Sequence, residues 1–354
     1  MSDTVFMTGF PGFIATRLVR RLAQDDNRFI LLVQPGLVDL AARQIDEITQ
    51  QTGRNGCDFH IVEGDITKPE LGMQPDIIET VRAEATTVFH LAAIYDLAVA
   101  RDIALRVNVE GTRNVNQFVR SLPNLKHYHY VSTCYVAGKR TGIIYENELK
   151  HQAGFRNYYE ETKYLAELEV EALKGDLPVT IHRPAVVCGD SKSGETAKYD
   201  GVYYLIHYLL KAPGLLSLLN IGNDQVTLNL VPVDFVVDSL AALATEREAV
   251  GKTVQLADPS PLTTLELFNT IAESIVERGA KVTVPARLVH TTLMLPLSPW
   301  ITGLPHHGVP YFFLKQSYDS TQAQRLLGTH QIRCPPFESY VHNIVAYAKL
   351  HPTL

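Results

Sequence analysis

Short runs of apolar residues alternate with longer stretches whose apolar residues recur at helical spacing through the first half of the chain. Runs that are apolar throughout are typical of strands buried on both faces of a parallel sheet. The runs lie at 4–8, 28–33, 59–67, 87–93, 127–133 and 180–187, and helical stretches lie at 16–23, 107–122 and 157–169. This alternation predicts an α/β fold, a Rossmann-type doubly wound parallel sheet with right-handed connections.

The second half of the chain has a different pattern. Residues 226–258 read as a return to the sheet, whereas the remainder is mostly helical, with apolar stretches at 202–210 and 215–219. We therefore predict a dinucleotide-binding domain of residues 1–187, to which 226–258 return, and a smaller, mostly helical C-terminal substrate lobe of 188–225 and 259–354. The leucine-rich stretches would serve core packing or line a tunnel for an acyl chain. Residues 288–304 are apolar, but prolines and His290 interrupt them, so they are too short and broken to span a membrane.

The first predicted strand ends in a glycine turn that leads directly into a helix. Gly9 would let the backbone turn sharply, Gly12 would let a pyrophosphate approach, and Ala15 would let the helix pack on the strand. The helix N-terminus would then face the phosphates with free N–H groups. This pattern predicts a dinucleotide site, although small residues in such a turn also serve packing alone. The other candidate contacts in the same loop are Phe10, Phe13 and Ile14.

The ends of the next strands supply further cofactor candidates. The second strand ends at Gln34, where a carboxylate would bind the ribose 2′-hydroxyl of NAD, and Arg43 follows in the next helix. The missing carboxylate favours NADP(H) over NAD(H), while Arg43 could equally be a solvated helix residue. Asp65 and Ile66 would meet the adenine edge, or Asp65 would be a turn residue. The fourth strand ends in small residues where a cofactor backbone would pass, at Leu91, Ala92 and Ala93.

Thr133, Tyr159 and Lys163 carry the candidate chemistry. A carbonyl that receives hydride develops negative charge on oxygen, so a proton donor and a second hydrogen-bond donor are needed beside it. Tyr159 and Lys163 are four residues apart on one helical face, and a nearby ammonium would lower the pKa of the phenol. The alternative is an ordinary surface pair. Asn108, polar within an amphipathic helix, would bond back to its helix or hold a water near the active centre.

Composition excludes several classes of protein. The 354 residues are 46% hydrophobic and 20% charged, as in globular proteins, and the net charge of −6 argues against a nucleic-acid-binding surface. Four scattered cysteines show neither metal-ligand nor disulfide spacing, which favours a reducing cytoplasm and no metal site. The N-terminus lacks the pattern of a signal peptide. Cys134 beside Thr133 could be a nucleophile, but buried cysteines usually act as small apolar residues.

These motifs together resemble the extended short-chain dehydrogenases/reductases. The resemblance runs from Thr8 to Ser191 and includes the opening glycine turn, His90-Leu91-Ala92-Ala93, Asn108 with Gly111-Thr112, Ser132-Thr133, Tyr159-x-x-x-Lys163 and Arg183-Pro184. Within that family, the stretches 64–72, 131–138 and 183–191 look like the branch of fatty acyl-CoA reductases (male-sterility type) and terminal thioester-reductase domains. The chain departs from the usual pattern at Ala15, a third-glycine position, and at Gln34, where NADPH-using members carry arginine.

The resemblance implies an NAD(P)H-dependent reductase acting on a carbonyl or an acyl thioester. Thr133, Tyr159 and Lys163 would be catalytic and Asn108 would assist a proton relay. The segment that would lie along the nicotinamide includes Pro184, Ala185 and Val187. The substrate would be an apolar acyl group presented by CoA or a carrier protein, reduced to aldehyde or alcohol, and the enzyme could be a homodimer. The alternatives are a ketone or hydroxy-group dehydrogenase, a sugar-nucleotide epimerase, and a cofactor-binding protein without turnover.

Overall fold

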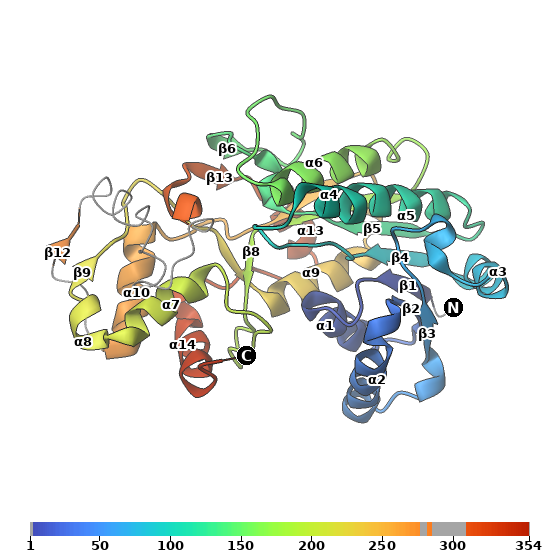
Figure 1. Ribbon diagram of the computed structural model, residues 1–354, viewed down its shortest axis with the longest axis horizontal. Helices are drawn as coiled ribbons and strands as arrows, with labels where there is room; N and C mark the ends of the chain where they lie inside the picture. The colour runs from blue at the N-terminus through green and yellow to red at the C-terminus, as the bar shows by residue number, and fades with distance from the viewer. Residues whose placement is uncertain (1–2, 277–281, 285–308, 354) are drawn as a thin grey trace.

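The structure is a computed structural model that describes residues 3–276, 282–284 and 309–353. In this part of the chain, seven strands form one parallel sheet in the order β11-β7-β5-β4-β1-β2-β3 (Figure 1). The change of direction on either side of β1 is the doubly wound arrangement that the sequence predicts. The strands are β1 (Thr4–Thr8), β2 (Arg28–Val33), β3 (Phe59–Glu63), β4 (Thr87–His90), β5 (His127–Val131), β7 (Val179–Pro184) and β11 (Thr253–Leu256).

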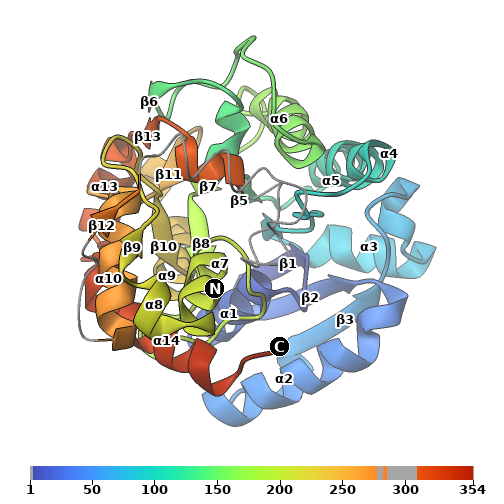
Figure 2. The ribbon, with the colours of Figure 1, turned by 60° about the vertical axis from the view of Figure 1, so that its left-hand side comes forward.

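Helices cover both faces of this sheet, because its strands are apolar on both sides. One face packs against α1 (Phe13–Leu22), α2 (Val38–Thr52) and α9 (Val233–Thr245). The other packs against α3 (Pro75–Glu84), α5 (Gly111–Arg120) and α6 (Tyr158–Glu171). Figure 2 shows α2 below the strands β1, β2 and β3, with α5 and α6 above them. The fold class predicted from the sequence is confirmed.

A second, smaller core forms the lobe beyond the carboxyl ends of the strands (Figure 1, left). Its apolar side chains come largely from three helices, α7 (Val202–Lys211), α10 (Thr264–Val276) and α14 (Val341–Leu350), and the short helix α8 (Pro213–Leu216) follows α7. Three parallel strand pairs lie outside the central sheet: β8 (Val186–Cys188) with β10 (Leu230–Pro232), β9 (Leu219–Asn220) with β12 (Val282–Thr283), and β6 (Gly142–Ile144) with β13 (Gln316–Tyr318).

Several boundaries differ from the predicted ones. The run 180–187 divides into β7, in the main sheet, and β8, which pairs with β10, because the ladder ends at Pro184. β3, β4 and β5 end earlier than predicted, so the residues after them lie in loops. The helix predicted over 107–122 begins as α4 (Arg101–Ala104), continues as a π-helix (Leu105–Glu110) and ends as α5.

The C-terminal segment contributes to both cores. Helix α13 (Thr321–Gly328) places Ala323, Leu326 and Leu327 in the core of the dinucleotide domain, against α9 and β11. The predicted division had assigned all of 259–354 to the substrate lobe, and this helix differs because its apolar face fits the edge of the central sheet. The apolar stretch 288–304 lies outside the described residues. Among the described helices, none has the length and hydropathy to cross a membrane.

Candidate active site

The glycine turn after β1 forms a cradle at the carboxyl edge of the sheet. Gly9 has φ +94°, and a Cβ there would lie 2.7 Å from the Ala92 amide nitrogen. The Gly12 N–H donates to the Gly9 carbonyl at 2.8 Å, and Gly12 is the N-cap residue of α1, where no side chain caps the helix. The first-turn N–H groups of α1 are therefore available to an anion, and no acidic side chain opposes one there. These residues fit a dinucleotide pyrophosphate.

The strand order brings the other cofactor candidates beside this turn. The ends of β4 and β2 flank β1, and β3 lies one strand further out, so Leu91, Gln34 and Asp65 follow strands near Gly9. The Thr8 hydroxyl accepts from the Ala92 N–H at 3.2 Å and fixes the loop after β4. Phe10 is buried, whereas Phe13, Ile14, Leu91, Ala92 and Ala93 are partly exposed at this edge.

Three of the cofactor candidates, Gln34, Arg43 and Asp65, lie in surroundings that do not by themselves indicate a cofactor contact. Gln34 and Arg43 are both exposed, and Arg43 lies on α2. The Asp65 carboxylate accepts from the Thr67 N–H at 2.9 Å and from its hydroxyl at 2.8 Å. Asp65 therefore acts as a turn residue in this structure, the alternative that the sequence left open. Ile66 is buried and packs closely on Gly111.

Thr133 and Tyr159 meet where β5 ends and α6 begins. The Asn157 side chain caps α6 by accepting from the Glu160 N–H at 3.0 Å, which places Tyr159 in the first turn. The Thr133 side chain lies near the Tyr159 phenol and, taken alone, lowers the pKa of that phenol. Burial outweighs it and raises the pKa of Tyr159 to about 12.

Lys163 is buried one helical turn after Tyr159 and is oriented toward the sheet. Its ammonium donates to the Tyr130 hydroxyl and to the Val131 carbonyl, both at 2.9 Å. Burial lowers the pKa of Lys163 to about 7, and the carboxylate of Glu167 opposes this change. The expectation that Lys163 lowers the pKa of Tyr159 is wrong for this structure, because the ammonium is engaged by Tyr130 and Val131 and the phenol is dominated by burial.

Asn108 joins two parts of the site. Its amide oxygen accepts from the Ile94 N–H at 2.8 Å, and its nitrogen donates to the Ile94 carbonyl and to the Thr162 hydroxyl, both at 3.0 Å. Both N–H groups are thereby used. Asn108 thus ties the loop after β4 to α6, which is neither of the two roles weighed from the sequence.

A buried chain of polar side chains continues from Lys163, and sequence reasoning missed it. The ring centroids of Tyr130 and His90 are 5.5 Å apart. His90 Nε2 lies 3.1 Å from the Thr112 hydroxyl, and His90 Nδ1 lies 2.7 Å from the Thr8 hydroxyl. The chain links the lysine to the strand that carries the glycine turn. The available signal was His90 at the end of β4 and Tyr130 next to the end of β5.

A small pocket opens near the segment after Pro184. Its walls include Val186 of β8 and Tyr135, two residues after Thr133. Its remaining lining residues are Thr227, Leu228, Asn229, Tyr311, Leu314, Gln316 and Tyr318. Pro184 is buried, and Ala185 and Val187 are partly exposed beside it. The wall is thus mixed, with three phenol rings among aliphatic and amide side chains.

Cys134 has the environment of a structural residue. Its side chain is 1% exposed, its thiol donates to the Arg183 carbonyl, and burial raises the pKa of that thiol. A thiolate nucleophile needs the opposite environment. Across the described ranges, no group of three or more histidine, cysteine or acidic side chains could hold a metal ion.

The doubly wound sheet, its glycine turn and the Thr133, Tyr159 and Lys163 set define an NAD(P)-binding protein of the extended short-chain dehydrogenase/reductase class. More particularly, the family described as "Male sterility protein" matches residues 7–240, so the chain belongs to that family. This is the branch that the sequence motifs resemble.

Relatives and solved structures agree with this assignment. The chain is 26% identical over 277 residues to "Fatty acyl-CoA reductase wat" of Drosophila melanogaster, covering 68% of this chain and 53% of that protein. It is 25% identical over 310 residues to "Alcohol-forming fatty acyl-CoA reductase" of Simmondsia chinensis, covering 67% and 62%. The chain thus spans little more than half the length of these relatives.

Two solved structures show the fold. The terminal R domain from the myxalamid PKS-NRPS biosynthetic pathway superposes with a TM-score of 0.81 at 23% identity, covering 100% of this chain and 92% of that domain. The UDP-glucuronic acid 4-epimerase from Bacillus cereus, solved in complex with NAD, gives a TM-score of 0.67 at 17% identity, covering 98% and 99%. The reductase domain is the better match of the two.

Proposed function

We propose that this protein is an NAD(P)H-dependent reductase that transfers hydride to an acyl thioester, carried by CoA or a carrier protein, and releases an aldehyde or an alcohol. The observation that carries the proposal is that Thr133 and the Tyr159 phenol meet at the sheet edge that also presents the glycine turn. Family membership and the named reductases among the relatives support it.

When bound, the nicotinamide cofactor supplies the hydride. Tyr159 then donates a proton to the carbonyl oxygen as negative charge develops there, and Thr133 gives that oxygen a second hydrogen bond. A pKa of about 12 keeps Tyr159 protonated at neutral pH, which is the form that donates. Lys163 is the member of the set whose ammonium would donate a hydrogen bond to a ribose hydroxyl of the cofactor. A thioester reduced once collapses to aldehyde and thiol, and a second round gives the alcohol.

NADP(H) is the cofactor that we propose over NAD(H). Gln34, at the end of β2, offers no carboxylate to a ribose 2′-hydroxyl, and Arg43 supplies an exposed positive charge on the following helix. A 2′-phosphate would gain from the guanidinium and would not be repelled at Gln34.

Nicotinamide absorbance with a series of acyl-CoA and acyl-phosphopantetheine thioesters tests the reaction, and chromatography identifies aldehyde or alcohol. Tyr159→Phe should abolish turnover while NADPH still binds. Its matched control is Tyr158→Phe, because Tyr158 is the adjacent tyrosine and is 45% exposed. The proposal fails if no thioester of any chain length is reduced, and turnover of a UDP-sugar in its place would establish the epimerase alternative.

Two further proposals concern the cellular location and the oligomeric state of the enzyme. We propose a cytoplasmic location, since Cys57, Cys134, Cys188 and Cys334 are all free thiols. Cell fractionation tests it. A homodimer is also proposed, and light scattering at enzyme concentrations used for assay would refute it by giving the mass of one chain.

A further inference from the structure

A fully buried ion pair lies behind the site. The Arg183 guanidinium, on β7, donates to Glu167 Oε1 from Nε at 2.8 Å and from Nη2 at 2.6 Å. The side chains are 1% and 0% exposed. A buried pair of this kind is weak evidence for stability, because desolvation costs offset the attraction between the charges. We therefore expect these two buried charges to have a role other than stabilising the fold.

The pair is bonded to the backbone and side chains that form the site. The Ser132 hydroxyl donates to Glu167 Oε2, and Ser132 directly precedes Thr133. The Arg183 carbonyl accepts from the Cys134 thiol, which directly follows Thr133. Arg183 Nη1 also donates to the Glu148 carbonyl at 3.0 Å. The Glu167 carboxylate thus fixes Ser132 on one side of Thr133, and the backbone of Arg183 fixes Cys134 on the other side.

Glu167 also continues the face of α6 that carries the catalytic candidates. Tyr159, Lys163 and Glu167 are spaced by four residues, so they lie one above another along the helix. Lys163 is 3% exposed, and its hydrogen-bond partners Tyr130 and Val131 are neutral. Glu167 is the negative charge that acts on this ammonium, whereas the buried Glu160, three residues before Lys163, is paired with Arg156 at 2.7 Å.

The other titratable groups around Lys163 do not replace that charge. His90 from β4 and Tyr130 from β5 are buried and neutral, and burial lowers the pKa of His90 to about 3. Arg183 from β7 adds a second positive charge behind Glu167. The charged pairs that join α6 to α4 and α5, Arg101 with Glu161 and Arg113 with Glu169, lie at the solvent-exposed surface.

We propose that Glu167, held between Arg183 and Ser132, is a positioning residue that keeps the Lys163 ammonium charged and in place for the cofactor ribose. Without Glu167, two buried positive charges would face each other and Lys163 would shed its proton. The role of the ammonium toward the cofactor rests on the proposed function, but its protonation is a property of the chain itself.

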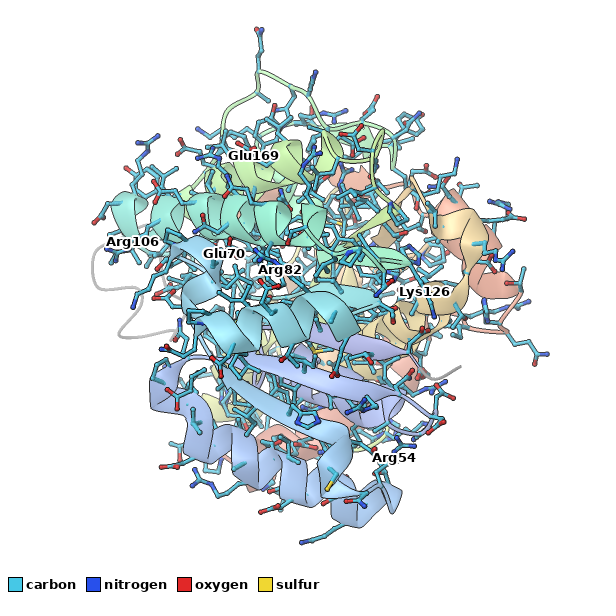
Figure 3. The ribbon with its side chains drawn as sticks, turned by 90° about the vertical axis from the view of Figure 1, so that its right-hand side faces the viewer. Arg54, Glu70, Arg82, Arg106, Lys126 and Glu169 are labelled. Atoms are coloured by element: carbon cyan, nitrogen blue, oxygen red, sulfur yellow. The ribbon has the colours of Figure 1, made fainter. Side chains whose placement is uncertain are left out.

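Three variants separate this role from simple support of the fold. Glu167→Gln removes the negative charge with little change of shape. Glu167→Gln combined with Arg183→Met removes both charges and leaves no unpaired guanidinium, so it guards against a single variant that fails to fold. Glu169→Gln is the matched control, since Glu169 lies on the outer face of the same helix and pairs with Arg113 at 2.7 Å (Figure 3).

The first measurement is the titration of Lys163 itself in the protein without cofactor. Lysine labelled with ¹³C at Cε gives a signal whose shift follows protonation, and Lys163→Met identifies it. We expect Glu167→Gln to move the midpoint to lower pH by about one to two units, from the attraction of charges one helical turn apart. The double variant should move the Lys163 midpoint less, because it removes a negative and a positive charge together. Glu169→Gln should not move this midpoint.

The second measurement is the pH dependence of NADPH affinity, followed by nicotinamide fluorescence. In Glu167→Gln, the rise in Kd with pH should begin at lower pH, and affinity should recover on acidification. An unchanged Lys163 midpoint in folded Glu167→Gln overturns the inference, as does an equal shift in the control. If the midpoint moves as expected but no thioester is reduced, the proposed function fails and the electrostatic role of Glu167 stands.

Discussion

Acidification should destabilise this protein through histidines buried in its central sheet. His127 and His129 of β5 and His182 of β7 form a cluster, with His129 Nδ1 3.0 Å from His182 Nε2. Burial lowers the pKa of His182 to about 3 and that of His127 to about 4. Since the folded-state pKa lies below that of the unfolded chain, the stabilisation is complete above pH ~6.5 and is lost as the pH falls.

The size of the effect follows from proton uptake. Between about pH 7.5 and about pH 5.5, an unfolded histidine takes up most of one proton while His182 takes up none, which costs about 1.4 kcal/mol of unfolding free energy. Urea titrations over this range measure it. In His182→Gln, whose amide keeps the contact with His129, the fall in unfolding free energy should be smaller by that amount.

The test compares how steeply the unfolding free energy depends on pH in the wild type and in His182→Gln. This comparison removes the contributions of other titratable groups. Burial raises the pKa of Glu146 to about 7, so its proton uptake in the folded state opposes the histidines as the pH falls, but equally in both proteins. The control is His342→Gln, because His342 is exposed on α14 and should leave the slope unchanged. Equal slopes in the wild type and in His182→Gln would refute the reasoning.

Three further substitutions test the site. Gly9→Ala places a methyl group against the loop after β4 at a positive φ. We therefore expect the unfolding free energy in urea titrations to fall by about 1–3 kcal/mol and NADPH binding in calorimetry to weaken strongly. Gly36→Ala, in open space, should change neither quantity. Gln34→Asp should shift the ratio of kcat/KM from NADPH toward NADH, and an unchanged ratio would contradict the assignment of this position. Cys134→Ala should leave turnover nearly unchanged, whereas a loss above about tenfold would favour a thiol mechanism.

The fold was predictable because its signal is local. Strands buried on both faces must be apolar throughout, and 28–33 matches β2 from end to end. Boundaries failed where apolar composition continues past the end of a strand of the central sheet, into a loop after His90 and into β8 after Pro184. Apolar composition alone does not mark where such a strand ends.

The site was predictable as a set of residue types but not as a set of contacts. The spacing of Tyr159 and Lys163 correctly placed both in one helix. It could not show that Lys163 binds Tyr130, because that contact depends on the packing of α6 across β5. Asn108 binds Ile94, a residue in a loop, and no periodicity describes a loop. Glu167 had a signal in the same four-residue spacing, but a glutamate in a helix reads as a surface residue until its burial is known.

The raised pKa of Tyr159 has a consequence for the direction of the reaction. With a pKa of about 12, the phenolate is about 10⁻⁵ of the population at neutral pH, so proton abstraction from an alcohol has almost no base available. Proton donation has no such limit, since an alkoxide is a much stronger base than a phenolate. Lys163, engaged by Tyr130 and Val131, does not change this balance in the protein alone. Protonated Tyr159 is thus the form that the proposed reduction of an acyl thioester would use.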